Sequence, residues 1–477
     1  MVLGNRVVAD KLSAMPETAD RATTLPDAEV ETLRARVAAL MPGVRADLEA
    51  LVRIPSVSAP AFDQSHVEAS AEAVAELLRG AGMPQVEILR VDGGAPAVVA
   101  RRPAPAGSRP GRPTVLLYAH HDVQPPGDPA RWDSAAFDPV ERDGRLYGRG
   151  CADDKAGVMV HVASLRALAD ELGVGVTVFV EGEEEIGSPT FAAFLARYRE
   201  RLAADVIVVA DSGNWRIGEP ALTSSLRGLV DGTIEVRTLD HAVHSGMYGG
   251  AVLDATTATV RLLDTLWDAD GSVAVAGLVA TEADDLGYAE ADLRTDAGVL
   301  DGVRLIGAGR LESRLWTRPA LTVIGIDVPS VADASNTLAP AVRVKFSLRV
   351  APGQDPAAAF EALRSHVVAH APWGARVEVT LGEAGQPWAG DVEGRVYDVA
   401  RWALETAWDR PPVHMGVGGS IPFIAALQEV YPAATVLVTG VEDPDTRAHG
   451  TNESVHLGEL RRACLAEALL LAALGRR

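Results

Sequence analysis

Five loops of the sequence carry a histidine or carboxylate side chain where an apolar run ends or an apolar helical pattern begins. These side chains are His120, Asp153, Glu185 with its neighbouring glutamates, Asp211 and His449. Imidazole and carboxylate oxygens are ligands that zinc, manganese and cobalt take in proteins. Two histidines and three carboxylates at the ends of such runs therefore predict a metal site.

The charges of this set favour two divalent cations. Three carboxylates, two such cations and one hydroxide ion are together neutral, whereas the carboxylates alone would repel one another. Two ions roughly 3.5 to 4 Å apart can share one carboxylate and one water, lower the pKa of that water towards ~7 and polarise a carbonyl. The expected reaction is hydrolysis of an amide.

Such a reaction also needs a general base beside the water. Adjacent glutamates in "VEGEEEIGS" allow one residue to bind metal while its neighbour takes the proton. In "HHDV", the aspartate two residues after His120 can accept the other ring N–H of that histidine.

Each of these residues has an ordinary structural explanation when it is taken alone. A histidine after a strand is usually a loop residue, an aspartate before a helix is usually an N-cap, and an acidic run is usually a solvated turn. The coincidence of metal-competent side chains at five loops favours the metal site over these separate explanations.

Alternating strands and helices must position these side chains. Apolar spacing of three and four predicts helices over 27–52, 63–79 and 158–172, and strands are predicted at 86–91, 96–101, 114–119, 174–181 and 205–210. In an open α/β sheet, ligands bind just past the carboxyl ends of the strands. These elements predict an α/β catalytic core in which a mixed sheet is flanked by helices.

A second region begins near residue 223. Strands are predicted at 229–239, 320–327, 341–350 and 376–382, and helices at 253–267 and 355–368, with a long acidic stretch from 268 to about 313. This order predicts a smaller α+β domain inserted into the first. The predicted division is a catalytic domain of residues 1–222 and 385–477, and an inserted domain of residues 223–384.

Composition excludes several classes of partner. The 477 residues include 44 Lys and Arg against 65 Asp and Glu, a net charge of −21 that opposes contact with a nucleic-acid backbone. The apolar C-terminal segment carries Glu467 and is too short for a membrane span, so it predicts a packed helix. Only two cysteines, Cys151 and Cys464, are present, which suits the reducing cytoplasm. We expect a cytoplasmic protein without a nucleic-acid or membrane partner.

Four segments together resemble a known family. They are "YAHHDVQPPGDPARWDSAAFDPVERDGRLYGRGCADDKAG", "VEGEEEIGS", "VVADSGNW" and "RAHGTNES". They are similar to the motifs of the acetylornithine deacetylase, succinyl-diaminopimelate desuccinylase and carnosinase family of two-metal peptidases. The resemblance runs from about residue 30 to 470, and "LWTRPALTVIGID" points to the carnosinase-like, nonspecific dipeptidase branch.

The resemblance implies a role for each residue of the predicted site. One metal would be held by His120, Asp153 and Asp211, and the other by Asp153, Glu185 and His449. Asp122 would orient His120, Glu184 would be the general base, and the Asp153–Asp154 peptide would be cis. Glu183 leaves an alternative, because a one-residue slip would exchange the roles of the glutamates. Zinc is the expected metal, with manganese or cobalt as alternatives.

The resemblance also implies that the inserted domain is a lid and dimerisation domain and that it supplies most of the substrate contacts. His244 would reach across the interface of a homodimer to stabilise the oxyanion, and Asn336, Thr337 and Arg349 would bind the substrate. Arg349 would take its C-terminal carboxylate, although an ordinary strand-end salt bridge explains that arginine equally well. The loop that holds Gly418, Gly419 and Ser420 would bring backbone amides to the substrate. The family often has Arg-Glu before the paired glycines, where this sequence has Gly416 and Val417.

The function that follows is hydrolysis of dipeptides by a hydroxide on two metal ions, with Glu184 as the base. An N-acyl-amino-acid deacylase or a carboxypeptidase could use the same site. A metal-dependent binding protein without catalysis is an alternative of another class, but such a protein needs no base beside its metal.

Overall fold

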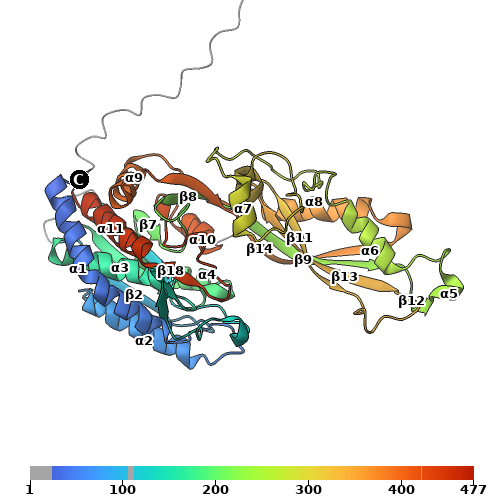
Figure 1. Ribbon diagram of the computed structural model, residues 1–477, viewed down its shortest axis with the longest axis horizontal. Helices are drawn as coiled ribbons and strands as arrows, with labels where there is room; N and C mark the ends of the chain where they lie inside the picture. Colours follow the sequence, from blue (N-terminus) through green and yellow to red (C-terminus); the bar gives the residue numbers. More distant parts are fainter. Residues whose placement is uncertain (1–23, 106–111, 420–421, 477) are drawn as a thin grey trace, which may run out of the picture.

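The computed structural model describes residues 24–105, 112–419 and 422–476. It has two lobes (Figure 1). The N- and C-terminal parts of the chain together form the larger lobe, and the middle of the chain forms the smaller one.

A nine-stranded mixed sheet forms the centre of the larger lobe. Its order is β1-β2-β6-β3-β7-β17-β8-β15, and β16 pairs with β8 outside this path. The strands are β1 (Gln85–Leu89), β2 (Ala97–Arg102), β3 (Thr114–His120), β6 (Gly175–Glu181), β7 (Val206–Val209), β8 (Ala221–Leu226), β15 (Trp388–Ala389), β16 (Val413–Val417) and β17 (Thr435–Val438). The neighbours β6, β3, β7 and β17 are mutually parallel. Their carboxyl ends therefore lie at one edge of the sheet.

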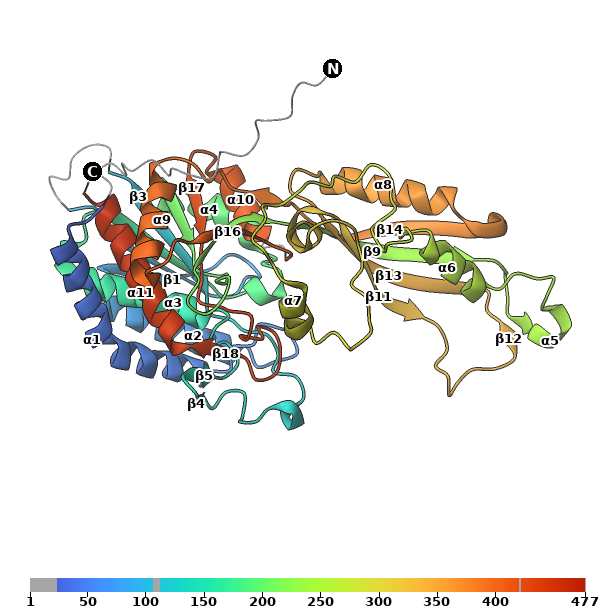
Figure 2. The same cartoon turned by 45° about the horizontal axis from the view of Figure 1, so that its top comes forward.

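Helices cover both faces of this sheet, as the apolar runs of its strands require. In β3, Val115 and Leu117 face one core, while Leu116 and Tyr118 face the other. The first core is closed by α1 (Asp27–Val52), α2 (Ser65–Gly80), α3 (Lys155–Leu168), α9 (Arg395–Trp408) and α11 (Leu457–Leu474). The second is closed by α4 (Phe191–Leu202) and α10 (Pro422–Val430). Figure 2 shows α1, α3, α11 and α9 side by side, and the predicted packing of the C-terminal helix is confirmed.

The smaller lobe is a four-stranded antiparallel sheet with helices. Its order is β11 (Ala320–Asp327), β13 (Ala341–Val350), β9 (Gly228–Arg237) and β14 (Arg376–Gly385). Residues of α6 (Ala255–Asp264) and α8 (Pro356–Ala369) share its apolar core. The acidic stretch before β11 holds α7 (Glu290–Asp296) and the short helix η4 (Ser313–Thr317). The predicted α+β insertion is confirmed.

An arm extends from the far end of the smaller lobe (Figure 1). It consists of β10 (Val243–His244), α5 (Ser245–Tyr248) and β12 (Thr337–Leu338), and β10 pairs with β12.

The chain crosses between the lobes at two neighbouring places. The first crossing joins β8 to β9, and the second joins β14 to β15. A Cβ atom on Gly228 would lie 2.6 Å from the carbonyl oxygen of Gly385, so only glycine fits where the two crossings meet. In the first crossing, β8 stays in the larger sheet as far as Leu226. The predicted boundaries after residues 222 and 384 remain predictions.

Several short elements were not predicted from the sequence. Strands β15 and β16 extend the large sheet, and β4 (Val140–Arg142), β5 (Arg145–Tyr147) and β18 (Ser454–His456) form a separate three-stranded sheet. The short helices are η1 (Pro129–Arg131), η2 (Ala169–Glu171), η3 (Glu184–Ile186) and η5 (Pro372–Gly374). Among the described residues, no helix has the length and apolar character needed to cross a membrane.

Candidate metal centre

The five predicted metal ligands meet at the carboxyl edge of the parallel strands. His120 is the last residue of β3, Asp211 follows β7, and Glu185 lies in η3 just after β6. Asp153 comes from the turn before α3, and His449 from the loop between β17 and β18. Because these strands are parallel neighbours, the loops that follow them converge.

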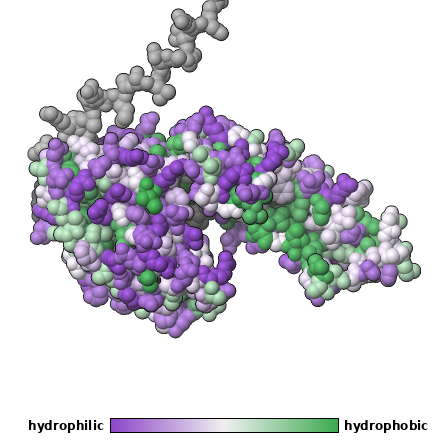
Figure 3. All heavy atoms as spheres, viewed as in Figure 1, coloured by the Kyte–Doolittle hydropathy of each residue, from purple (hydrophilic) through white to green (hydrophobic). Residues whose placement is uncertain are grey.

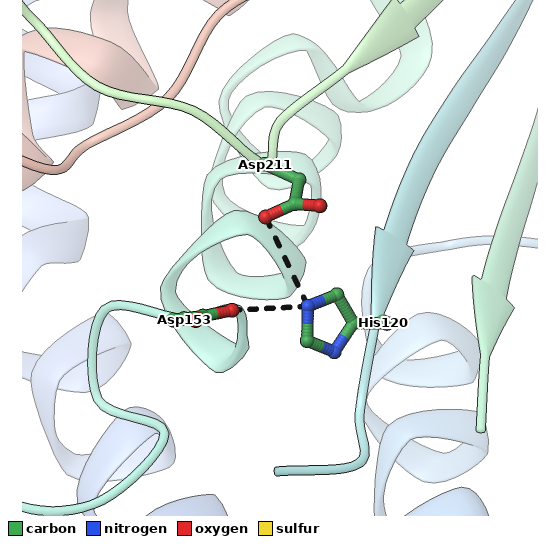
Figure 4. Close-up of side chains that lie close together, drawn as sticks. All are labelled: His120, Asp153 and Asp211. Carbon is green, nitrogen blue, oxygen red and sulfur yellow. Dashed lines mark hydrogen bonds and ion pairs between the residues drawn. The ribbon is translucent and has the colours of Figure 1, made fainter. Parts of the chain in front are cut away.

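Asp153 lies between the two histidines and is common to two groups of donor atoms. Its Oδ1 is 3.1 Å from Nε2 of His120, which is 3.9 Å from Oδ1 of Asp211 (Figure 4). Its Oδ2 is 3.0 Å from Nε2 of His449, which is 3.2 Å from Oε2 of Glu185. Within each group of three, the donor atoms lie within 4.8 Å of one another. The arrangement offers two adjacent cation sites that share one carboxylate.

The electrostatics of this cluster fit divalent cations. Burial raises the pKa of Asp211 to about 7; His120 opposes this shift, and Asp153 and Glu185 add to it by repulsion. Burial also raises the pKa of Glu185, with the charge of Asp153 as the next cause. Hydrogen bonds to Asp153 and Glu185 raise the pKa of His449 to about 11. The carboxylates therefore compete for positive charge, which cations in the two groups would supply.

Asp122 orients the parts of the cluster on β3 and η3. Its buried carboxylate accepts the backbone N–H groups of Glu184 and Glu185, at 3.2 and 3.0 Å. Nδ1 of His120 is 3.0 Å from the backbone oxygen of Asp122 and 3.4 Å from its Oδ1. The sequence predicts that the carboxylate of Asp122 orients the ring of His120. In the structure, the backbone carbonyl of Asp122 contributes to this orientation as well.

Two neighbouring glutamates have different surroundings. The carboxylate of Glu183 accepts the backbone N–H groups of Thr190 and Ala95, at 2.7 and 3.0 Å, so it fastens the start of α4. Burial raises the pKa of Glu184 well above its usual range, His120 opposes this shift, and Asp211 and Glu185 add to it. The charges of the donor cluster thus act on the carboxyl group of Glu184, whereas that of Glu183 is taken up by backbone hydrogen bonds.

Three supporting residues escaped the sequence analysis. Glu453 is fully buried, and its carboxylate accepts the backbone N–H groups of Gly150, Ala152 and Asp153 and pairs with Arg149 at 2.5 Å. Gln124 donates to Glu185 through its backbone and its side chain. Asp154 accepts the backbone N–H of His120 at 3.1 Å, and the Asp153–Asp154 peptide is cis, as predicted. Glu453 lies within the quoted segment "RAHGTNES", but nothing in its spacing marks a partner 300 residues away.

Three of the predicted substrate residues lie far from this cluster. His244 and Thr337 are paired across β10 and β12, and the N–H of Ser245 donates to the carbonyl of Asn336 at 2.9 Å. His244 and Thr337 belong to the arm at the far end of the smaller lobe, and Asn336 directly precedes its strand β12 (Figure 1). A single chain does not bring His244, Asn336 or Thr337 to the metal centre.

The remaining predicted contacts lie near the crossings between the lobes. Arg349 is half-buried on β13 and pairs with Leu229 of β9. A Cβ atom on Gly418 would lie 2.6 Å from Nη2 of Arg227. A Cβ atom on Gly419 would lie 3.8 Å from Val417, with no other described atom outside the adjacent residues within 4 Å. Ser420 lies outside the described residues.

The departure at Gly416 and Val417 has a packing explanation. A Cβ atom on Gly416 would lie 2.5 Å from Cβ of Trp316 in η4, so a larger residue does not fit there. Trp316 belongs to an apolar cluster that Trp215 and Val417 also contact. The acidic stretch of the insertion therefore folds back over the glycine loop.

The chain is similar to known proteins. Residues 116–473 match the model of peptidase family M20/M25/M40. The chain belongs to this family. A cysteinylglycine-S-conjugate dipeptidase of Corynebacterium striatum is 38% identical over 373 residues, covering 76% of this chain and 82% of that protein. A β-Ala-His dipeptidase of Rattus norvegicus is 29% identical over 375 residues, covering 74% of this chain and 75% of that protein.

The fold of this M20 family member is also that of known structures. The crystal structure of human carnosine dipeptidase 1 superposes with a TM-score of 0.78 at 24% identity, covering 95% of this chain and 100% of that one. The predicted family, its carnosinase-like branch and the assignment as a metallopeptidase are confirmed.

Proposed function

We propose that this chain is a metal-dependent dipeptidase. The observation that carries the proposal is the pair of donor groups that share Asp153, with the carboxyl group of Glu184 beside them. The names of its relatives support the substrate class, since they include dipeptidases for cysteinylglycine conjugates and for β-Ala-His.

His120, Asp153 and Asp211 would hold one divalent cation, and Asp153, Glu185 and His449 the other. When bound, the cations would supply Lewis-acid polarisation of the peptide carbonyl and acidify water. Glu184 would take a proton from the attacking water and later donate it to the leaving amine. Asp122 would keep Glu184 and Glu185 in register through its two backbone hydrogen bonds.

We also propose that the protein acts as a homodimer through its smaller lobe. Strand β11 is an edge strand, and Ile324 and Ile326 on it are 55% and 45% exposed. In Figure 3, hydrophobic residues gather on the smaller lobe in this region. An exposed apolar edge strand is a template for pairing with another chain. In a dimer, His244 on the distal arm could reach the metal centre of the partner subunit and stabilise the oxyanion there.

The decisive experiment is hydrolysis of a substrate panel by purified protein. The panel contains cysteinylglycine, an S-substituted cysteinylglycine, β-Ala-His and N-acetyl amino acids, each tested after chelation and after addition of zinc, manganese or cobalt. We expect chelation to abolish cleavage of the dipeptides and a divalent cation to restore it.

Glu184→Gln is the matched control for this experiment. It should bind the same amount of metal as the wild type and lose roughly 10²- to 10⁴-fold in kcat. Metal-restored cleavage of N-acetyl amino acids alone would replace the dipeptidase proposal with the deacylase alternative. Failure to cleave any substrate with metal bound would contradict both.

A further inference from the structure

Arg227 occupies the first crossing between the lobes and is only 8% exposed. Its Nε donates to the carbonyl oxygen of Gly418 at 3.1 Å. Its Nη1 is 3.4 Å from the carbonyl oxygens of Arg314, within η4, and Arg318, directly after it. The guanidinium is therefore fixed between the glycine loop and the insertion, and each of these partners is a neutral carbonyl.

A buried arginine without a carboxylate partner is unusual in this molecule. Arg145 and Arg149 are also buried, and each forms an ion pair, with Asp443 at 2.9 Å and with Glu453 at 2.5 Å. No described carboxylate pairs with Arg227. Burial and the nearby charge of Arg349 lower the pKa of Arg227 to about 10, so it remains a cation at neutral pH. Uncompensated buried charge is costly and points to an anionic partner from outside the chain.

One edge of this guanidinium has no described hydrogen-bond partner. Nε and Nη1 are engaged, whereas Nη2 forms no hydrogen bond with a described atom. Nη2 also retains some solvent exposure. Nη2 borders Gly418, where even a methyl side chain would collide with it. The N–H groups of Nη2 therefore open onto the glycine loop. Arg349 is close by, because it pairs with Leu229, two residues after Arg227.

We propose that Arg227 is a specificity-determining residue whose Nη2 group, together with Arg349, binds the terminal carboxylate of the substrate. This inference rests on the proposed function. The carbonyls of Gly418, Arg314 and Arg318 hold the guanidinium in place, so its ordering costs little when the ligand arrives. Two neighbouring cations select a free carboxylate over a carboxamide, which would leave buried charge unpaired.

The test compares two ligands that cannot be hydrolysed. They are an alanyl-leucine analogue with CH2–NH in place of the scissile CO–NH, as the free acid and as the C-terminal amide. Isothermal titration calorimetry on the metal-loaded protein gives Kd for both. In the wild type we expect the acid to bind at least about tenfold more tightly than the amide.

Arg227→Gln removes the charge and retains an amide that can bond to the carbonyl of Gly418. We expect it to weaken binding of the acid roughly 10- to 100-fold, the usual effect of losing a hydrogen bond to a charged group, and binding of the amide less than about threefold. Arg343→Met is the matched control. Arg343 is an exposed arginine on the same face of β13 as Arg349, six residues away, and its loss should leave the ratio of the two Kd values unchanged.

Two results would overturn the proposal. One is a wild type that binds the acid and the amide equally well. The other is an Arg227→Gln variant in which binding of both ligands is weakened equally, because Arg227 would then only hold the two lobes together. If Arg227→Gln does not fold, Arg227→Lys is the variant to measure, because a lysine ammonium group cannot replace the several fixed N–H donors of the guanidinium. The Kd ratio must then fall at least about threefold, and an unchanged ratio contradicts the proposal. These are binding measurements, so absence of dipeptide hydrolysis would overturn only the proposed function.

Discussion

At the scale of single residues, Glu453 organises the turn that presents Asp153. Its carboxylate accepts three backbone N–H groups of that turn and neutralises the buried Arg149. We expect Glu453→Gln to lower the free energy of unfolding by roughly 3 to 5 kcal/mol, because it leaves a buried cation unpaired. Urea unfolding in the presence of chelator separates this effect from metal affinity. Glu49→Gln, which removes the ion pairs of Glu49 with Arg45 and Arg53 on the surface of α1, should cost at most about 1 kcal/mol.

The same scale shows which residues a sequence can reveal. His120 and Asp211 could be predicted because each follows an apolar strand, and strand ends converge in a parallel sheet. Glu453 and Arg227 could not, because their partners lie hundreds of residues away or are backbone carbonyls that carry no residue-type signal. The sequence could not distinguish Glu183 from its neighbours, because its hydrogen bond from the N–H of Thr190 exists only in the folded chain.

At the scale of elements, a buried pair joins α3 to α11 beneath the sheet. Nδ1 of His161 is 2.8 Å from Oε2 of Glu467. Burial would lower the pKa of His161, but Glu467 and the carbonyl of Tyr118 raise it above its usual value. A raised pKa in the folded state stabilises the protein at low pH, and this contribution is lost as the pH rises through that pKa.

Glu467→Gln should therefore lower Tm more at about pH 6 than at about pH 9. Differential scanning calorimetry at the two pH values measures the difference. In a His161→Gln background, which has no titrating ring at this position, the effect of Glu467→Gln should lose its pH dependence. An equal loss of Tm at both pH values in the wild-type background would contradict the charge assignment.

Long elements were predictable and short ones were not. The patterns at 320–327 and 341–350 match β11 and β13 residue for residue. Each is a full strand length rich in apolar and β-branched residues, and in β13 these alternate with polar ones. Strands β15 and β18 have two and three residues, too few for a period to show. Their pairing is decided by the fold around them rather than by their own sequence.

At the scale of the whole molecule, the single chain leaves two parts of the predicted site apart. The metal centre lies in the larger lobe, while His244 is exposed on the distal arm (Figure 1). The sequence could assign the metal ligands and His244 to one reaction. It could not show that they lie apart in a single chain, because their separation depends on how the chain folds. If the homodimer proposal is correct, each arm serves the centre of the partner subunit.

Mixing two defective variants tests this assignment directly. Glu184→Gln lacks the base and His244→Ala lacks the arm histidine, so each homodimer should be strongly impaired. In a mixed dimer, one subunit retains Glu184 and receives His244 from the other. Random pairing of equal amounts should therefore restore about a quarter of the wild-type active sites in a symmetric dimer. Co-expression with two affinity tags isolates the mixed dimer for kcat measurement. If that dimer is no more active than the two parents, His244 does not act across the interface.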